Sequence, residues 1–133
     1  MHIEILNTGT ELLLGTTQNT HGAWIGQELI KLGLRVQRQT TVPDGEAVRE
    51  AIKESIERAD VLIVTGGLGP TSDDLTREAT AEAMGIDLIE DEHALRVVVE
   101  YFKKLDKYMA DSNKKQALIP CGAEVLPNPN GTA

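Results

Sequence analysis

The sequence predicts an α/β fold in which helices cover both faces of a mainly parallel sheet, a three-layer α/β/α arrangement. Apolar, strand-like segments occur at residues 2–6, 34–42 and 61–65. The stretches between them carry apolar residues at helical spacing. Glycine or proline follows each strand-like segment. This alternation of strand and helix favours parallel strands joined by right-handed crossovers.

The first half of the chain predicts one strand, one helix and a second strand. After the strand at residues 2–6, apolar side chains on one face indicate a helix over residues 20–32, with Asn19 as its N-terminal cap. Gly33 stands where a left-handed residue ends a helix. Residues 34–42 alternate well enough for a half-buried strand, which the turn at residues 43–45 ends.

The second half continues the alternation. A helix is expected around residues 48–56, with Asp44 or Gly45 as its cap, and a buried strand follows at residues 61–65. Further along, we expect a helix at residues 74–84 closed by Gly85, a helix around residues 95–105 preceded by Asp91, and a strand at residues 123–126.

Composition limits the classes of function. The 133 residues fit one domain, residues 1–133, and the 41% hydrophobic and 26% charged content is that of a folded protein. A net charge of −8, with no basic stripe, argues against nucleic acid as a partner. No apolar run reaches the length of a membrane span. The lone Cys121 suits a reducing compartment, so we expect a cytoplasmic protein.

The segment TGGLGPTSDDLT, residues 65–76, is the strongest candidate for a binding site. Glycine reaches positive φ and lets a ligand approach the backbone, so Gly66, Gly67 and Gly69 favour a turn whose amides bind phosphate. The positive end of the following helix adds to the same potential. A tight turn that merely requires glycine is the alternative, because the spacing matches neither common phosphate-loop motif.

Asp73 and Asp74 follow this turn directly. Acidic residues at a helix start complement the helix dipole, which accounts for one of them. We interpret the pair as one cap, Asp73, and one ligand, Asp74, for a divalent metal such as Mg²⁺, which prefers few carboxylates together with phosphate oxygens. Dipole complementation by both residues is the alternative.

A second loop, NTGTELLLG at residues 7–15, follows the first strand and should lie at the same edge of the sheet. Gly9 ends the strand, Thr10 offers a hydroxyl, and Glu11 offers a carboxylate toward the ligand. A solvated loop charge is the plain alternative for Glu11. The leucines that follow predict a short turn packed against the core.

Three segments resemble one known family. GTELLLG (residues 9–15), TGGLGPTSDDLT (residues 65–76) and PNPNGTA (residues 127–133) are similar, in order and spacing, to the N-terminal domain of the CinA (competence/damage-inducible) family. That domain in turn resembles the molybdopterin-binding domains of the MoaB/MogA and MoeA group. The resemblance covers essentially the whole chain.

The resemblance implies a three-layer domain that binds a small phosphorylated nucleotide or pterin at the strand ends. In the CinA branch it implies hydrolysis of ADP-ribose to AMP and ribose 5-phosphate with a divalent metal, Mg²⁺ or Co²⁺. In the other branch it implies a molybdopterin ligand. The family's nicotinamide mononucleotide deamidase belongs to a separate C-terminal domain. A non-catalytic interaction domain is a third hypothesis.

The resemblance also assigns residues. It places Glu11 at an acidic catalytic position, with Asp73 and Asp74 as the acidic pair. The family continues past the GTA motif, so we expect a domain shortened at its C-terminal end that pairs an open strand edge with another copy, giving a homo-oligomer. The phosphate loop corresponds to Gly66, Gly67, Gly69, Pro70 and Thr71, and a loop facing the same pocket corresponds to Asn128, Gly131 and Thr132.

Overall fold

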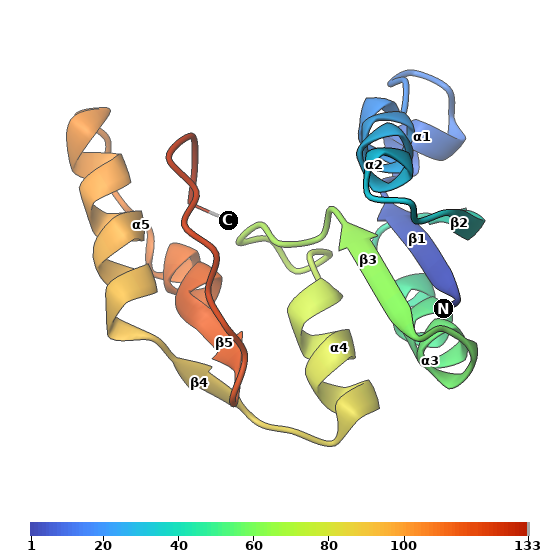
Figure 1. Cartoon of the computed structure of the whole chain (residues 1–133). Coiled ribbons are helices and arrows are strands. Elements are labelled where there is room, and N and C mark those ends of the chain that lie inside the picture. Colours follow the sequence, from blue (N-terminus) through green and yellow to red (C-terminus); the bar gives the residue numbers. More distant parts are fainter. Residues whose placement is uncertain (133) are drawn as a thin grey trace.

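A three-stranded parallel sheet forms the centre of the N-terminal half in this computed structural model, which describes residues 1–132. The strand order is β2 (Val36–Val42), β1 (Ile3–Thr8) and β3 (Val61–Thr65) (Figure 1). Because both neighbours of β1 run parallel to it, all three strands end at the same edge of the sheet. The loops after these strands therefore meet there.

The central strand β1 is buried along its whole length, as its apolar sequence requires. Ile5 pairs with Ile63 and Leu6 with Val64 in register with β3. On the Leu6 face, the core is closed by helix α3 (Ala47–Arg58) and helix α4 (Thr76–Met84). Leu6, Val48, Ile52 and Ala79 form the buried cluster between them.

Two helices precede β2 in the chain and pack against it. Helix α1 (Thr10–Leu13) is a single turn, and helix α2 (Thr20–Lys31) lies so close to the strand that Gly22 touches Gln39. A β-carbon on Gly22 would stand 1.8 Å from the Gln39 amide nitrogen. Glycine is thus required at this point of α2 by the close approach of β2.

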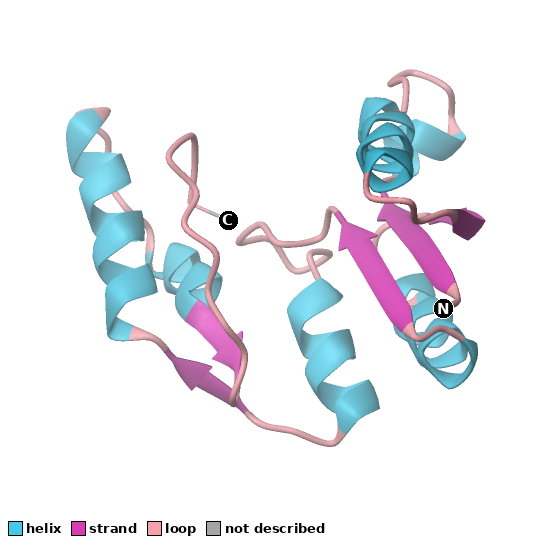
Figure 2. Cartoon of the chain, in the orientation of Figure 1, coloured by secondary structure: helices cyan, strands magenta, loops and turns pink. Residues whose placement is uncertain are grey.

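The C-terminal half forms a separate, smaller unit around an antiparallel pair. Strand β4 (Leu88–Glu90) pairs with β5 (Leu118–Pro120). Helix α5 (Glu92–Lys104) and the 3₁₀ helix η1 (Asp111–Ala117) pack against each other beside this pair. Figures 1 and 2 show α4 between the parallel sheet and the β4–β5 pair.

The predicted fold class is confirmed: a parallel sheet flanked by helices. Asn19 caps α2 by accepting a hydrogen bond from the Gly22 amide, as expected, and Asp91 caps α5 through the Ala94 amide. Gly33 and Gly85 have positive φ at the ends of α2 and α4.

Three expectations were wrong. Residues 123–126 form no strand, and the β4–β5 pair appears instead, which was not predicted because each strand has only three residues. Asp44 and Gly45 do not cap α3, since its N-cap position is Glu46 and no side chain caps it. Helix α4 begins at Thr76 rather than at residue 74.

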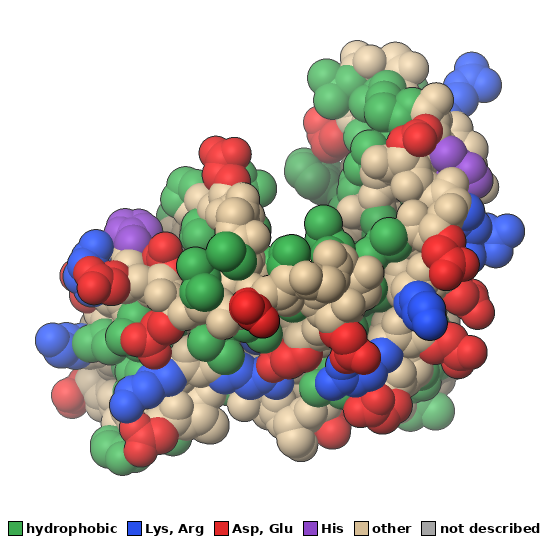
Figure 3. Space-filling model, turned by 90° about the horizontal axis from the view of Figure 1, so that it is seen from below, with side chains coloured by type: hydrophobic (Ala, Val, Ile, Leu, Met, Phe, Trp, Pro, Cys, Tyr) green, Lys and Arg blue, Asp and Glu red, His purple; other side chains and the backbone are tan. Residues whose placement is uncertain are grey.

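Charged side chains of both signs are interspersed on the face seen in Figure 3, with no continuous basic stripe. Among the residues that the structure describes, no helix combines the length and the apolar character that crossing a membrane demands.

Candidate functional site

The three loops at the strand ends are joined by hydrogen bonds. The Gly9 amide donates to the Val42 carbonyl at 3.1 Å. The Thr10 amide donates to the Asp44 carboxylate at 2.9 Å, and the Thr10 hydroxyl accepts from the Asp44 amide at 3.3 Å. The third loop joins them through the Gly45 amide and the Asp73 carbonyl, 3.2 Å apart. The expected convergence of these loops is therefore present, and Asp44 is the residue that fastens the first to the second.

The turn at Gly66 and Gly67 has no room for side chains. Both residues have positive φ, 91° and 67°. A β-carbon on Gly66 would stand 2.5 Å from the Thr8 carbonyl oxygen, and one on Gly67 would stand 2.2 Å from the Thr76 hydroxyl. Thr76 binds this turn from the other side, because its hydroxyl donates to the Gly66 carbonyl at 2.9 Å and its amide to the Gly67 carbonyl at 3.2 Å. These bonds fix the start of α4.

A cavity of about 260 Å³ opens at the ends of β1 and β3. The first turn of α2, which contains no acidic residue, borders it, so the positive end of that helix is not neutralised there. Thr8, which is 6% exposed, lines this cavity, and its buried hydroxyl has no hydrogen-bond partner among the described residues. The lining includes Thr8, Glu11, Asn19, Thr20, His21 and Gly66.

Glu11 lines this cavity from α1 and is exposed, so of the predicted acidic residues it is the one whose carboxylate is placed for a ligand there. The leucines that follow do not pack into the core as expected. Leu13 is 53% exposed and Leu14 is 73% exposed. The segment forms the helical turn α1, which has no buried residue and is bonded to the loop after β2 through Thr10 and Asp44.

The backbone amides of Gly69 and Thr71 bind the carboxylate of Asp74. Asp74 Oδ2 accepts from the Thr71 amide at 2.9 Å and from the Thr71 hydroxyl at 2.5 Å. It also lies so close to Gly69 that a β-carbon there would be 2.5 Å away. Burial raises the pKa of Asp74, but the hydrogen bonds from Thr71 and Gly69, together with Lys115, lower it on balance below its ordinary value. The second half of the predicted phosphate loop thus already holds an anion.

Asp73 does not cap α4, contrary to the prediction. The N-cap position is Leu75, and neither aspartate accepts a capping hydrogen bond from the first turn, since the helix starts two residues after Asp74. Asp73 is exposed, and only the Ser72 hydroxyl approaches its carboxylate, at 3.5 Å. The two neighbouring aspartates therefore have different surroundings: one is held inside the loop, and the other faces solvent.

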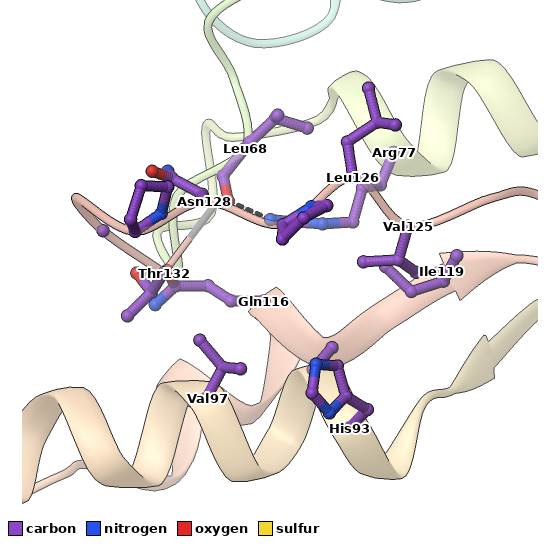
Figure 4. A pocket seen from close by; sticks show the side chains of 14 residues that line it. Leu68, Arg77, His93, Val97, Gln116, Ile119, Val125, Leu126, Asn128 and Thr132 are labelled. Carbon is purple, nitrogen blue, oxygen red and sulfur yellow. Dashed lines mark hydrogen bonds between the residues drawn. The ribbon is translucent and has the colours of Figure 1, made fainter.

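The C-terminal motif lies beside a second cavity, of about 470 Å³, between the Leu68 loop, α5 and the tail (Figure 4). Asn128, Gly131 and Thr132 line this cavity and not the one that contains Glu11. Thr132 is held there by its hydroxyl, which donates to the Gln116 side chain. The expected single pocket is thus two cavities, with the loop of residues 66–68 contributing to both.

Within residues 1–132, no group of three or more His, Cys, Asp or Glu side chains is arranged to hold a metal ion. The orphan hydroxyl of Thr8 and the start of α2 were missed as site features. The sequence did contain a signal for the second: Asn19 was identified as a cap, and the residues after it include no acid. The sequence contained no comparable signal for Thr8, because the burial of its hydroxyl depends on the packing of Gly66.

Comparison with known proteins gives the family. Residues 4–132 match the family model described as a probable molybdopterin binding domain. A CinA-like protein of Akkermansia muciniphila is 52% identical over the whole of this chain, and a putative competence-damage inducible protein of Clostridium novyi is 50% identical. The chain spans 32% of the length of each of these relatives.

Solved structures agree. The crystal structure of CinA from Thermoplasma acidophilum superposes with a TM-score of 0.85 at 36% identity, covering 99% of this chain and 78% of that one. MoaB from Pyrococcus furiosus, described as synthesising tungsten cofactor, superposes with a TM-score of 0.56 at 25% identity, covering 78% of this chain and 64% of that one. The chain belongs to the CinA family and is its domain of the probable molybdopterin-binding type.

Proposed function

We propose that the cavity at the ends of β1 and β3 binds the phosphates of a nucleotide, and that the domain hydrolyses the pyrophosphate bond of ADP-ribose with a divalent metal. The observation that carries the binding is the buried, unpartnered hydroxyl of Thr8 in the same cavity as the start of α2. A phosphate oxygen there would satisfy this donor and would meet the positive end of the helix.

The cavity also offers uncharged hydrogen-bonding groups to a phosphate. Gly66 lines it with backbone, and Thr8 fills the place that a β-carbon on Gly66 would take. Glu11 is the carboxylate that lines this cavity among the described residues. An anionic ligand would therefore meet one acid and several uncharged donors, which is a workable balance when a cation accompanies the ligand.

The residues fit a metal of one kind only. A single carboxylate, Glu11, suits Mg²⁺ or Co²⁺ held largely by substrate phosphate oxygens, and does not suit a metal enclosed by protein ligands. We assign this role to Glu11 rather than to Asp74, because Thr71 already occupies Asp74 Oδ2. When bound, such a metal neutralises diphosphate charge and makes water a better nucleophile.

The deciding experiment is incubation with ADP-ribose and Mg²⁺ or Co²⁺, followed by chromatography for AMP. Glu11→Gln should reduce AMP release at least tenfold while leaving the melting temperature unchanged, since Glu11 is exposed. Thr8→Val removes the hydroxyl at nearly constant volume. It should weaken ADP-ribose binding about tenfold without loss of stability, because the hydroxyl has no partner in the unliganded fold. An absence of AMP with either metal would refute the hydrolase.

The family match favours a second candidate, a molybdopterin ligand in the same cavity. A pterin phosphate would use the same donors, so Thr8→Val should weaken its binding as well. Titration with molybdopterin, followed by pterin fluorescence, separates the candidates. Saturable binding by the wild type without AMP release from ADP-ribose would favour the second over the first.

A further inference from the structure

The second cavity is bordered by a buried positive charge that forms no ion pair within the described chain. Arg77, in the first turn of α4, is 6% exposed and borders the cavity. Its Nη2 donates to the Leu68 carbonyl, while Nη1 is buried without any hydrogen-bond partner (Figure 4). No carboxylate among residues 1–132 forms an ion pair with it.

Such an arrangement is costly without an anion. A guanidinium removed from water loses solvation that only an opposite charge or several acceptors restore. Burial accordingly lowers the pKa of Arg77, although Glu78 and Asp74 act in the opposite direction from a distance. The other charged residues of the chain are mostly paired or exposed, so Arg77 stands apart from them.

Apolar side chains form much of the remaining wall of the cavity, and His93, Gln116, Asn128 and Thr132 are its polar side chains. Leu68 comes from the loop before α4, Val97 from α5, and Ile119 from β5. Val125 and Leu126 add apolar side chains from the tail (Figure 4). A volume of about 470 Å³ is within the range of sites for small organic molecules. The polar side chain of Gln116 is already engaged by Asn113 and Thr132.

We propose that this cavity is a second ligand site, separate from the strand-end cavity, which takes an organic anion with an apolar, ring-sized body. The carboxylate, sulfonate or phosphate of the ligand pairs with Arg77, and the body lies against Leu68, Val97 and Ile119. Nη1 is the nitrogen that we assign to the anion, because it is buried without a hydrogen-bond partner, whereas Nη2 is bound to Leu68. A ligand with a single negative charge is therefore sufficient to pair with Arg77.

The probe for the test is 8-anilinonaphthalene-1-sulfonate, whose fluorescence rises on binding, compared with its uncharged counterpart N-phenyl-1-naphthylamine. The wild type should bind the sulfonate saturably, with one site per chain, and at least tenfold more tightly than the neutral compound. Arg77→Met should abolish that preference by weakening sulfonate binding at least tenfold, while Arg77→Lys keeps part of it. Val97→Phe, which fills the cavity from α5 and keeps Arg77, should weaken both compounds.

Two controls separate this site from the proposed hydrolase site. Glu11→Gln should leave sulfonate binding unchanged, and ADP-ribose should not displace the sulfonate. Equal affinity of the wild type for the charged and neutral compounds would overturn the proposal, and that comparison does not depend on the folding of any variant. Displacement by ADP-ribose would overturn the separateness of the site.

Discussion

At the scale of single residues, the turn at Gly66 and Gly67 is the most constrained part of the candidate site. Gly67 needs glycine for two reasons: its φ is positive, and a β-carbon would collide with the Thr76 hydroxyl. Gly85 has nearly the same φ, 66°, but open space around it. Comparing substitutions at Gly67 and Gly85 therefore separates the free-energy cost of a positive φ from the cost of a steric collision.

Gly67→Ala should lower the free energy of unfolding by about 3 kcal/mol, and Gly85→Ala by about 1 kcal/mol. The difference arises because Thr76 cannot move away from the added β-carbon without losing its hydrogen bonds to the Gly66 and Gly67 carbonyls, which fix the start of α4. Urea titrations followed by circular dichroism measure both values. Equal losses in the two variants would show that the collision is relieved at no cost, and that Thr76 does not fix the turn.

The adjacent aspartates provide a second comparison. Asp74→Ala leaves the Thr71 amide without its acceptor and should cost about 2 kcal/mol of unfolding free energy. Asp73→Ala removes an exposed carboxylate and should change it by less than about 0.5 kcal/mol. Thermal or urea unfolding of both variants checks this. A larger loss for Asp73→Ala than for Asp74→Ala would mean that Asp73 does cap the helix.

The sequence alone predicted which residues of this loop are special but not what each one does. Asp73 and Asp74 were assigned to a helix start at residue 74, and the helix starts at Thr76. The start is set by the bonds from Thr76 to Gly66 and Gly67, which come from the folded turn and not from local propensity. Asn19 was predicted correctly as a cap because its capping bond is local, three residues along the chain. Asp91, which was predicted only to precede α5, caps that helix through a bond of the same spacing.

At the scale of elements, a buried ion pair joins β1 to α3. Glu4 lies in the middle of the buried strand, and its carboxylate accepts from Arg58 Nε at 2.8 Å and from Nη2 at 3.0 Å. Arg38 on β2 adds a contact at 3.8 Å. The hydrogen bonds from Arg58 have the largest effect on the pKa of Glu4 and lower it. Burial acts next and raises it, and the charges of Arg58 and Arg38 lower it again, so the pKa stays below its ordinary value.

This ion pair predicts a pH dependence of stability. Because the folded-state pKa of Glu4 is below the unfolded value of 4.5, its contribution is present above that pH and is lost as the pH falls through the folded value. Glu4→Gln should cost about 2 kcal/mol at pH 7, since it removes the charge from the hydrogen bonds to Arg58, which is partly exposed and keeps its contacts with Glu54 and Ser55. In urea titrations, the difference in unfolding free energy between the wild type and Glu4→Gln should become smaller below pH 4.5. A gap that stays constant down to pH 3 would contradict the ionic origin.

Element prediction succeeded where the apolar pattern was long. Strands β1 and β3 and helices α2, α3 and α5 follow directly from their periodicity. Strands β4 and β5 were missed because three residues give no period, and their pairing joins Leu88 to Pro120, far apart in sequence. The expected strand at residues 123–126 has strand-like composition but no neighbouring strand with which to pair.

At the scale of the whole molecule, the chain comprises a parallel-sheet half and a smaller antiparallel half, connected by α4. This division explains why one predicted pocket became two cavities. The sequence placed all three motifs at one site because each resembles a ligand loop. Yet the third motif, residues 127–132, lies with α5 and η1, on the far side of the Leu68 loop.

In the whole molecule, several large apolar side chains near α2 are exposed to solvent, which is unfavourable for a helix with no further partner. Trp24 is 62% exposed, and Leu13, Leu14, Ile30 and Leu32 of the same α1–α2 region are exposed as well. The sequence predicted self-association through an open strand edge, and β3 is indeed an edge of its sheet within the described residues. We propose that the homo-oligomer forms instead over α2, because large apolar side chains contribute most of the free energy of association.

Trp24→Glu should therefore shift the mass measured by light scattering toward that of one chain, 14.4 kDa, at a concentration where the wild type is larger. A charge placed among apolar side chains at an interface opposes association, whereas it is harmless on a free surface. Tyr108→Glu is the matched control, since Tyr108 is 88% exposed but follows α5. It should leave the mass unchanged. Two results would show that α2 is not the interface: a wild type with the mass of one chain at about 100 µM, or an equal loss of mass in both variants. The edge strand β3 would then be the place to test, with a proline substitution.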